Sequence, residues 1–350
     1  MKEPDLCLDV WNCWKEPHFG HVLGFDMTST HACFFLAWET EDGWLRKKLK
    51  LDQDGVVILP VCLRCGQTGK DCTDRDLPKD PTALRGFLEP PDKWKEKMND
   101  AYTYGDALRT CIESLRDRVF TYNPEVREAL ERNDLLIIAS CPDQWKSLEQ
   151  EISYRELLRE IFNCQPLALC PAAAARVSHM IRHEGIDIDR GIVLYDFGYD
   201  ITCTYVGLED EAEIHFKPMG RDVWKRKSWE KKDKEDLGFD LVNSVYISLR
   251  KQRKKRTGNA AYGTVVLSGP LSEDRDIFSS LFFAYPGATI YCDTSRTTVA
   301  RGLCLEGIRM VMAGVHPNRL LKYCWKELSQ KCHSDLPWLR DQPDEPINEI

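Results

Sequence analysis

The sequence predicts an α/β protein whose two halves repeat one architecture. Apolar strand-like runs alternate with amphipathic helix-like runs twice along the 350 residues, as expected for α/β layers. Each half also contains a strand–turn–strand element with an aspartate at the turn, HVLGFDMTSTHACFFLAW over 21–38 and GIVLYDFGYDITCTYV over 191–206. We therefore expect two lobes that enclose a ligand site, with Asp26 and Asp196 facing it.

The composition indicates a folded protein without a membrane span. Apolar residues make up 43% of the chain and there are ten Trp, enough for a real core. The formal charge of −8 gives no general attraction to nucleic acid or to anionic membranes. No apolar run approaches the roughly 20 residues that cross a bilayer, and the acidic start with its prolines is not a secretory signal. We expect a cytoplasmic protein.

Fifteen cysteines, an odd number, lie mostly inside apolar runs. This pattern favours reduced, buried thiols over a disulfide framework. The cysteines expected to be buried are Cys33, Cys111, Cys141, Cys164, Cys203, Cys292 and Cys304.

In the first half, residues 1–20 are interpreted as an extension, and residues 64–100, rich in Pro, Gly, Cys and charge, as loop with short elements. Alternating or continuous apolar runs predict strands at 21–25, 32–38, 44–49, 56–63 and 134–140. Apolar residues at helical spacing predict helices from Tyr104, over 148–162 and over 172–183, the last opened by Pro171.

In the second half, strands are expected at 213–217, 264–268 and 289–292, and helices at 240–256, 277–283 and 298–312. We divide the chain into the extension 1–20, a first lobe 21–190, a second lobe 191–315, and a C-terminal helix with an acidic tail, 316–350.

Five segments in this order resemble the actin-like ATPase superfamily, most closely the nucleotide-binding domain of DnaK-type heat-shock chaperones. They are GFDMTST (24–30), like the first phosphate loop; LLIIASCPDQW (135–145) with the helices that follow; YDFGYDIT (195–202), like the second phosphate loop; VVLSGPLS (265–272), like the adenosine-side turn; and TTVARGLCLEG (297–307), like the closing helix. The resemblance covers about residues 20–315 and implies a two-lobed actin-like ATPase fold, which is a duplicated ribonuclease H-like fold.

The resemblance also implies a site for ATP or ADP with Mg. Asp26 and Asp196 fall on the two aspartates that surround the metal and the attacking water, and would hold Mg through its waters. Lys70, in GQTGK, falls on the lysine that stabilises the transferring phosphate. The nucleotide would contact Thr28, Ser29, Thr30, Gly198, Tyr199, Thr202 and Gly269.

Several residues depart from the family pattern. Thr28 stands where a glycine lets the backbone approach the phosphate. Cys170 replaces the expected glutamate, and Tyr199 and Asp200 replace two glycines, which brings a ring and a negative charge toward the phosphate position. The family's adenine-clamping subdomain is reduced to the link 257–263, so we expect a reduced second lobe.

These departures lead to the hypothesis of a divergent chaperone-like protein with a degenerate pocket. It would bind nucleotide weakly or not at all, and act as an interaction or regulatory module for a protein partner. The alternative is an active Mg-dependent ATPase, because Asp26, Asp196 and Lys70 are all present. A third hypothesis is polyanion binding through RKQRKKR (250–256), although nucleic acid is not the partner that we favour.

Cys62, Cys65 and Cys72 are spaced closely enough to offer three zinc ligands, with His31 or Cys33 as a fourth. Their spacing is not that of a known zinc finger, and we favour reduced thiols in a hairpin.

Overall fold

The computed structural model describes residues 19–63, 83–142, 145, 147–164, 167–186, 191–197, 201–207, 217–224, 237, 240, 243, 263–269, 271–312 and 339–341. Within them the chain forms two sheets and six α-helices, and the α/β class is confirmed. Among these residues no helix is both long and apolar enough to cross a membrane.

The first sheet has the strand order β12-β3-β2-β1-β5-β6, with β4 paired to β2. Its strands are β1 (His21–Met27), β2 (His31–Thr40), β3 (Gly43–Lys48), β4 (Ile58–Pro60), β5 (Leu135–Cys141), β6 (Leu167–Pro171) and β12 (Leu339–Asp341). The second sheet has the order β11-β10-β7-β8-β9. Its strands are β7 (Ile192–Phe197), β8 (Ile201–Gly207), β9 (Lys217–Trp224), β10 (Thr264–Ser268) and β11 (Thr289–Asp293).

The two sheets repeat one strand order. In each, three consecutive antiparallel strands (β1–β2–β3 and β7–β8–β9) are extended by two parallel strands beside the first (β5 and β6, β10 and β11). A helix follows the last parallel strand in both cases: α4 (Ala172–Glu184) after β6, and α8 (Thr298–Met312) after β11. The two strand–turn–strand elements of the sequence are β1–β2 and β7–β8.

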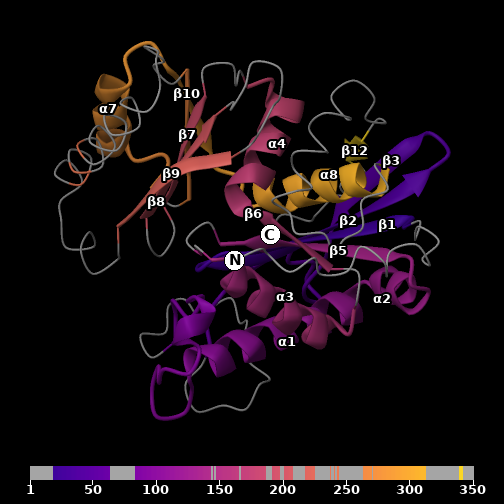
Figure 1. Ribbon diagram of the computed structural model, residues 1–350. Helices are drawn as coiled ribbons and strands as arrows, with labels where there is room; N and C mark the ends of the chain where they lie inside the picture. The colour runs from indigo at the N-terminus through magenta and orange to yellow at the C-terminus, as the bar shows by residue number, and fades with distance from the viewer. Residues whose placement is uncertain are drawn as a thin grey trace, which may run out of the picture.

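Helices α4 and α8 lie between the two sheets (Figure 1). Each packs against the sheet of the other half: α4 contributes Ala173, Val177 and Met180 to a cluster with β7 and β10. In turn α8 contributes Leu303 and Cys304 to a cluster with β1, β2 and β5. The two halves are therefore held together by α4 and α8, each of which packs against the sheet of the other half.

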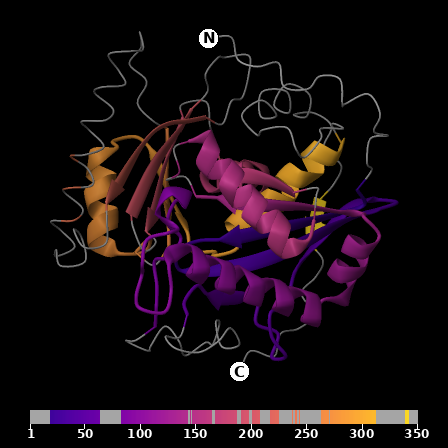
Figure 2. The same cartoon turned by 60° about the horizontal axis from the view of Figure 1, so that its bottom comes forward.

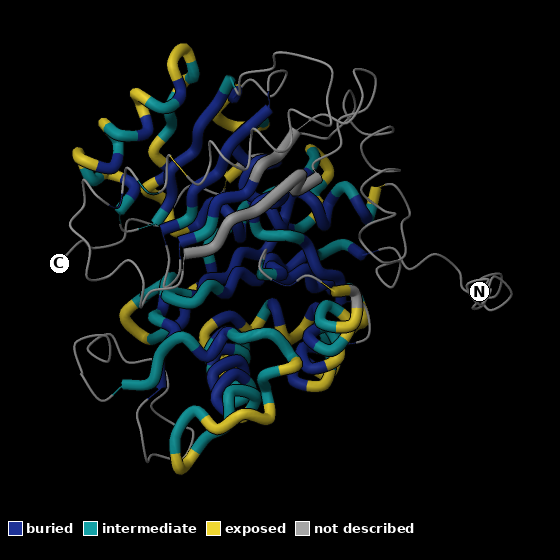
Figure 3. Tube along the Cα trace, turned by 60° about the vertical axis from the view of Figure 1, so that its left-hand side comes forward, coloured by how far each residue is buried: buried dark blue, intermediate teal, exposed yellow. Residues whose placement is uncertain are grey.

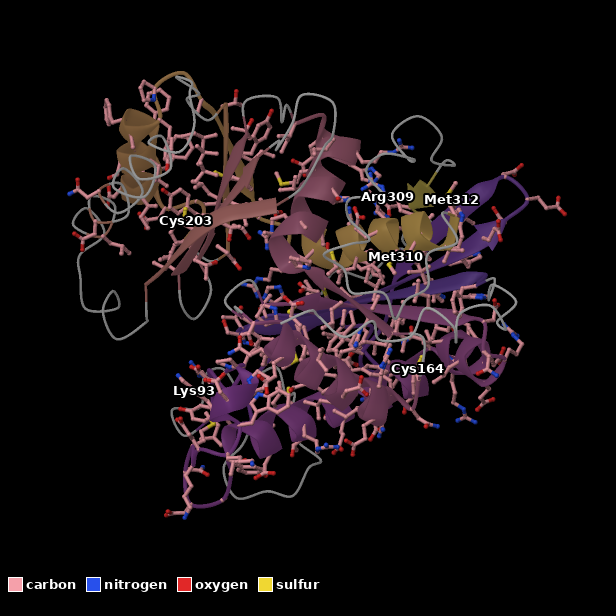
Figure 4. The ribbon with its side chains drawn as sticks, viewed as in Figure 1. Lys93, Cys164, Cys203, Arg309, Met310 and Met312 are labelled. Atoms are coloured by element: carbon pink, nitrogen blue, oxygen red, sulfur yellow. The ribbon has the colours of Figure 1, made fainter. Side chains whose placement is uncertain are left out.

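The outer faces of the sheets are covered by the remaining helices. The first sheet is covered by α1 (Tyr104–Tyr122), α2 (Pro124–Glu131) and α3 (Leu148–Phe162), which lie below it in Figure 1 and come forward in Figure 2. The second sheet is covered by α7 (Arg275–Ala284). The strands are mostly buried and the exposed positions gather on the outer helices and turns (Figure 3). Cys203 of β8, for example, is fully buried inside the second sheet (Figure 4).

Local sequence explains where several helices begin. Thr103 and Asp106 form a capping box at the start of α1, and Ser147 and Gln150 form one at the start of α3. Asp274 caps α7 by accepting backbone hydrogen bonds. A short 3₁₀ turn, η3 (Pro91–Lys93), lies in the segment expected as loop with short elements.

Several expectations for the elements are confirmed and others are wrong. The helices at 148–162 and 298–312 and the strand at 264–268 have the expected bounds. Residues 213–216 of the strand expected at 213–217 lie outside the described residues, and the described strand β9 covers 217–224. The strands β6 and β12 and the helix α2 were not expected. Cys292 is exposed rather than buried, since β11 is an edge strand. Residues 1–18, 313–338 and most of 240–256 lie outside the described residues.

Candidate functional site

Two rows of polar side chains lie at corresponding places in the two sheets. In the second sheet, Asp196, Ser268 and Asp293 are register partners at the ends of β7, β10 and β11. In the first sheet, Asp26 and Ser140 stand at the ends of β1 and β5, and Ser140 Oγ accepts a 3.1 Å hydrogen bond from the backbone N–H that follows Asp26. Both rows lie at the carboxyl ends of parallel strands, where α/β sheets place ligand sites.

The row in the second sheet is tied to the start of α8. Oδ1 of Asp293 accepts hydrogen bonds from the Thr298 hydroxyl at 2.7 Å and from the Ser295 N–H at 3.1 Å. Oδ2 of Asp293 accepts a third bond, from Nη1 of Arg176 on α4, at 3.0 Å. The Asp293 carboxylate is thus engaged by groups of the chain itself.

Arg176 of α4 joins the two halves through its ion pair with Asp293 of β11. Its side chain is 7% exposed and that of Asp293 is 2% exposed, so their ion pair is buried. Burial raises the pKa of Asp196, an effect that the charge of Arg176 opposes and the charge of Asp293 reinforces, while the Ser268 hydroxyl donates a hydrogen bond to Asp196. The charge of Arg176 therefore acts on one predicted catalytic aspartate, and its guanidinium is hydrogen-bonded to a second carboxylate.

The turn between β1 and β2 uses its hydroxyl groups internally. Oγ1 of Thr28 accepts hydrogen bonds from the N–H groups of Thr30 and His31, at 3.2 and 3.0 Å. The hydroxyls of Thr28 and Thr30 each lie 3.1 Å from Nδ1 of His31, and Nε2 of His31 lies 3.1 Å from the carbonyl oxygen of Arg296. With its proton on Nε2, His31 donates to Arg296 and accepts from the threonine hydroxyls. Ser29 lies in the same turn and is partly buried.

His31 is neutral at physiological pH. Burial, followed by the positive charges of Arg296 and Arg176, lowers the pKa of His31 to about 4. Burial, and then the charge of Asp26, raises the pKa of the Cys33 thiol well above its usual range. Asp26 itself is 1% exposed.

Two other predicted ligand residues have visible structural roles. Gly269 has φ +88°, and a Cβ at this position would lie 2.5 Å from the carbonyl oxygen of Phe197. Close contact between the ends of β10 and β7 therefore requires glycine here, with or without a ligand. Thr202 is the second residue of β8 and pairs with Asp196 across the hairpin. Lys70, Gly198 and Tyr199 lie outside the described residues.

A comparison with known protein families and with curated proteins finds no match to this chain.

Of the residues expected to hold a Mg-bound nucleotide, the structure describes Asp26, Asp196 and the hydroxyls of the β1–β2 turn. Carboxylates at the ends of β1 and β7 are suitable oxygen ligands for Mg²⁺. The positive charge of Arg176 already acts on the Asp196 carboxylate, and Arg176 forms an ion pair with Asp293. The hydroxyls of Thr28 and Thr30 are also directed into their own turn.

The zinc hypothesis is not tested by the structure. Cys62 is buried, and Cys65 and Cys72 lie outside the described residues. His31 is held by the β1–β2 turn and by Arg296. In the part of the chain that the structure describes, no three His, Cys, Asp or Glu side chains are arranged to hold a metal ion.

Sequence reasoning did not identify Arg176 or Asp293. A signal was present for Arg176, which lies three residues after Ala173 and one before Val177, on the apolar face of α4. A charged residue on such a face is expected to be buried and paired. No comparable signal marks Asp293, since its partners come from α4 and from the start of α8.

Proposed function

We propose that this chain is a divergent actin-like protein, resembling the nucleotide-binding domain of DnaK-type chaperones, that has become an interaction or regulatory module with weak or no nucleotide binding. The observation that carries the proposal is the buried Arg176–Asp293 pair, whose charges act on the pKa of Asp196. A guanidinium fixed there supplies the charge that a nucleotide-bound cation would otherwise supply.

The repeated strand order supports the two-lobed fold in this proposal. Three antiparallel strands followed by two parallel ones, with a helix after the last, occur once in each half. The turn after β1 contacts the second half, because Nε2 of His31 lies 3.1 Å from the carbonyl oxygen of Arg296, which follows β11. A fold of this kind grips its ligand between the halves, where Arg176 now lies.

Thermal melting with and without millimolar Mg-ATP or Mg-ADP tests the proposal. A ligand at one hundred times its Kd stabilises a protein by about 2.7 kcal/mol, which raises Tm by several degrees. We expect no Mg-dependent rise for the unmodified chain. A rise that is lost in Asp196→Asn, together with ATP turnover, would instead establish the active ATPase.

A second variant tests whether Arg176 is the cause. Arg176→Ala removes the guanidinium while Asp196 and Asp26 stay in place. We expect Mg²⁺ alone to raise the Tm of this variant and not that of the unmodified chain. The control is Arg176→Lys, which keeps the charge, and which we expect to respond to Mg²⁺ no more than the unmodified chain does. Equal responses of all three proteins would contradict the role given to Arg176.

The basic segment 250–256 lies outside the described residues, so polyanion binding stays a prediction. Binding to nucleic acid that weakens steeply with salt would support it.

A further inference from the structure

A buried arginine on the edge of the first sheet is matched by a carboxylate from the far end of the chain. Arg46 of β3 is 0% exposed, and its Nε and Nη2 donate to the two carboxylate oxygens of Asp341 at 2.5 and 3.3 Å. This two-point contact is the geometry in which guanidinium recognises carboxylate most specifically.

Groups of Arg46, His183 and Arg301 surround this carboxylate, and we call them the slot. Arg46 Nη1 donates to the carbonyl oxygen of Arg301 at 3.3 Å, and Arg46 Nη2 lies 3.1 Å from Nε2 of His183. Nη1 of Arg301 lies 3.8 Å from Asp341 Oδ2. The slot is therefore built from β3, α4 and α8, and its side chains orient Arg46 toward one anion.

The Asp341 carboxylate lies on a very short strand. β12 is three residues long and pairs in parallel with β3, in the register Leu339–Trp44, Arg340–Leu45 and Asp341–Arg46. The side chain of Asp341 is 46% exposed although its partner is fully buried. The permanent part of the site is thus the slot, and the occupant is a small, solvent-accessible segment.

We propose that the β3 edge with Arg46 is a docking site for an extended peptide segment of a protein partner that carries a carboxylate, and that Asp341 occupies it in cis. Strand addition supplies the main-chain hydrogen bonds, and the buried guanidinium selects an acidic residue at the position of Asp341. A fully buried cation requires an anion, so a partner must displace β12 by presenting the same group.

The site is distinct from the cluster around Arg176. Arg176 lies seven residues before His183 on α4, about 10 Å along the helix axis at a rise of 1.5 Å per residue. The inference therefore holds whether or not the chain binds nucleotide, and the two tests fail independently.

Peptide binding to the full chain tests the inference. The probe is a fluorescein-labelled peptide with the sequence of residues 334–344, and the control peptide differs only by asparagine at the position of Asp341. We expect the Asp341→Asn chain, whose own tail no longer presents the carboxylate, to bind the probe at least tenfold more tightly than the control peptide by fluorescence anisotropy. The unmodified chain should bind the probe at least tenfold more weakly than Asp341→Asn does.

Asp341→Glu is the matched protein control, because it keeps a carboxylate in the slot and should bind the probe no better than the unmodified chain. If Asp341→Asn does not fold, Asp341→Ser replaces it. Equal affinity for the two peptides, or absence of binding, would overturn the proposal. Dissociation of a dimer of the unmodified chain on adding the probe would assign the slot to a second copy and overturn the choice of partner.

Discussion

Gly302 is the position at which a single methyl group should separate the two central helices. A Cβ on Gly302 of α8 would lie 1.8 Å from the carbonyl oxygen of Ala175 on α4, and real Cβ contacts are essentially never closer than 3.0 Å. Gly302→Ala therefore requires a displacement of about 1.2 Å between two backbones. Overpacking of this kind costs about 1–3 kcal/mol or more, whereas Ala in a helix is favoured over Gly by about 1 kcal/mol.

We expect Gly302→Ala to lower the free energy of unfolding by about 1–2 kcal/mol, measured by urea denaturation. Helix propensity alone predicts the opposite sign, so stabilisation would refute the reasoning. Gly307→Ala is the matched control on the same helix, since its Cβ would meet Cγ1 of Val22 at 2.4 Å, a side-chain atom. Val22→Ala removes that atom and should couple favourably with Gly307→Ala in a double-mutant cycle, but not with Gly302→Ala.

Two further predictions concern pH and a strained turn. Burial, then the charges of Arg46 and His183, lowers the pKa of His179 to about 3, against about 6.5 in the unfolded chain. Between these values the unfolded state binds more protons. The free energy of unfolding should therefore decrease as the pH is lowered below 6.5, by up to about 1.4 kcal/mol per pH unit for this residue. His179→Leu should remove that part of the pH dependence in denaturation curves. Gly269→Ala should destabilise by about 2 kcal/mol or more, because φ is +88° and Phe197 leaves no room. Gly287→Ala, with φ +80° and open space around it, should lose only the stability that the unfavourable backbone conformation costs. An equal loss of stability in the two variants would contradict the role of Phe197.

Strong local periodicity explains what the sequence predicted well. The helix α3 combines an amphipathic pattern with a capping box, and α8 carries a long apolar face with small residues. Both were expected with their observed bounds. The two aspartate turns were found because each follows a continuous apolar strand, and Asp26 and Asp196 indeed occupy equivalent ends of β1 and β7.

Long-range partners explain what sequence reasoning missed. β12 has three residues, and the pair between Arg46 and Asp341 joins positions 295 residues apart. No local pattern reports such a contact. β6 is a five-residue apolar run ending at Pro171, which was interpreted only as the start of a helix. His179 and His183 stand at helical spacing i, i+4, and sequence reasoning overlooked this pair.

Two buried arginines join elements that are far apart in the sequence. Arg176 joins α4 to β11 through Asp293, and Arg46 joins β3 to α4, α8 and β12. A ligand moves two lobes only if it contacts their open and closed arrangements differently. The Arg176–Asp293 pair already supplies one such contact, so the proposed function leaves a nucleotide little differential contact to add there. At the β3 edge the contact is made by an exposed residue of a three-residue strand, so occupancy can change without unpacking either sheet. We infer that, if this protein is switched by a partner, the exchange takes place at Arg46.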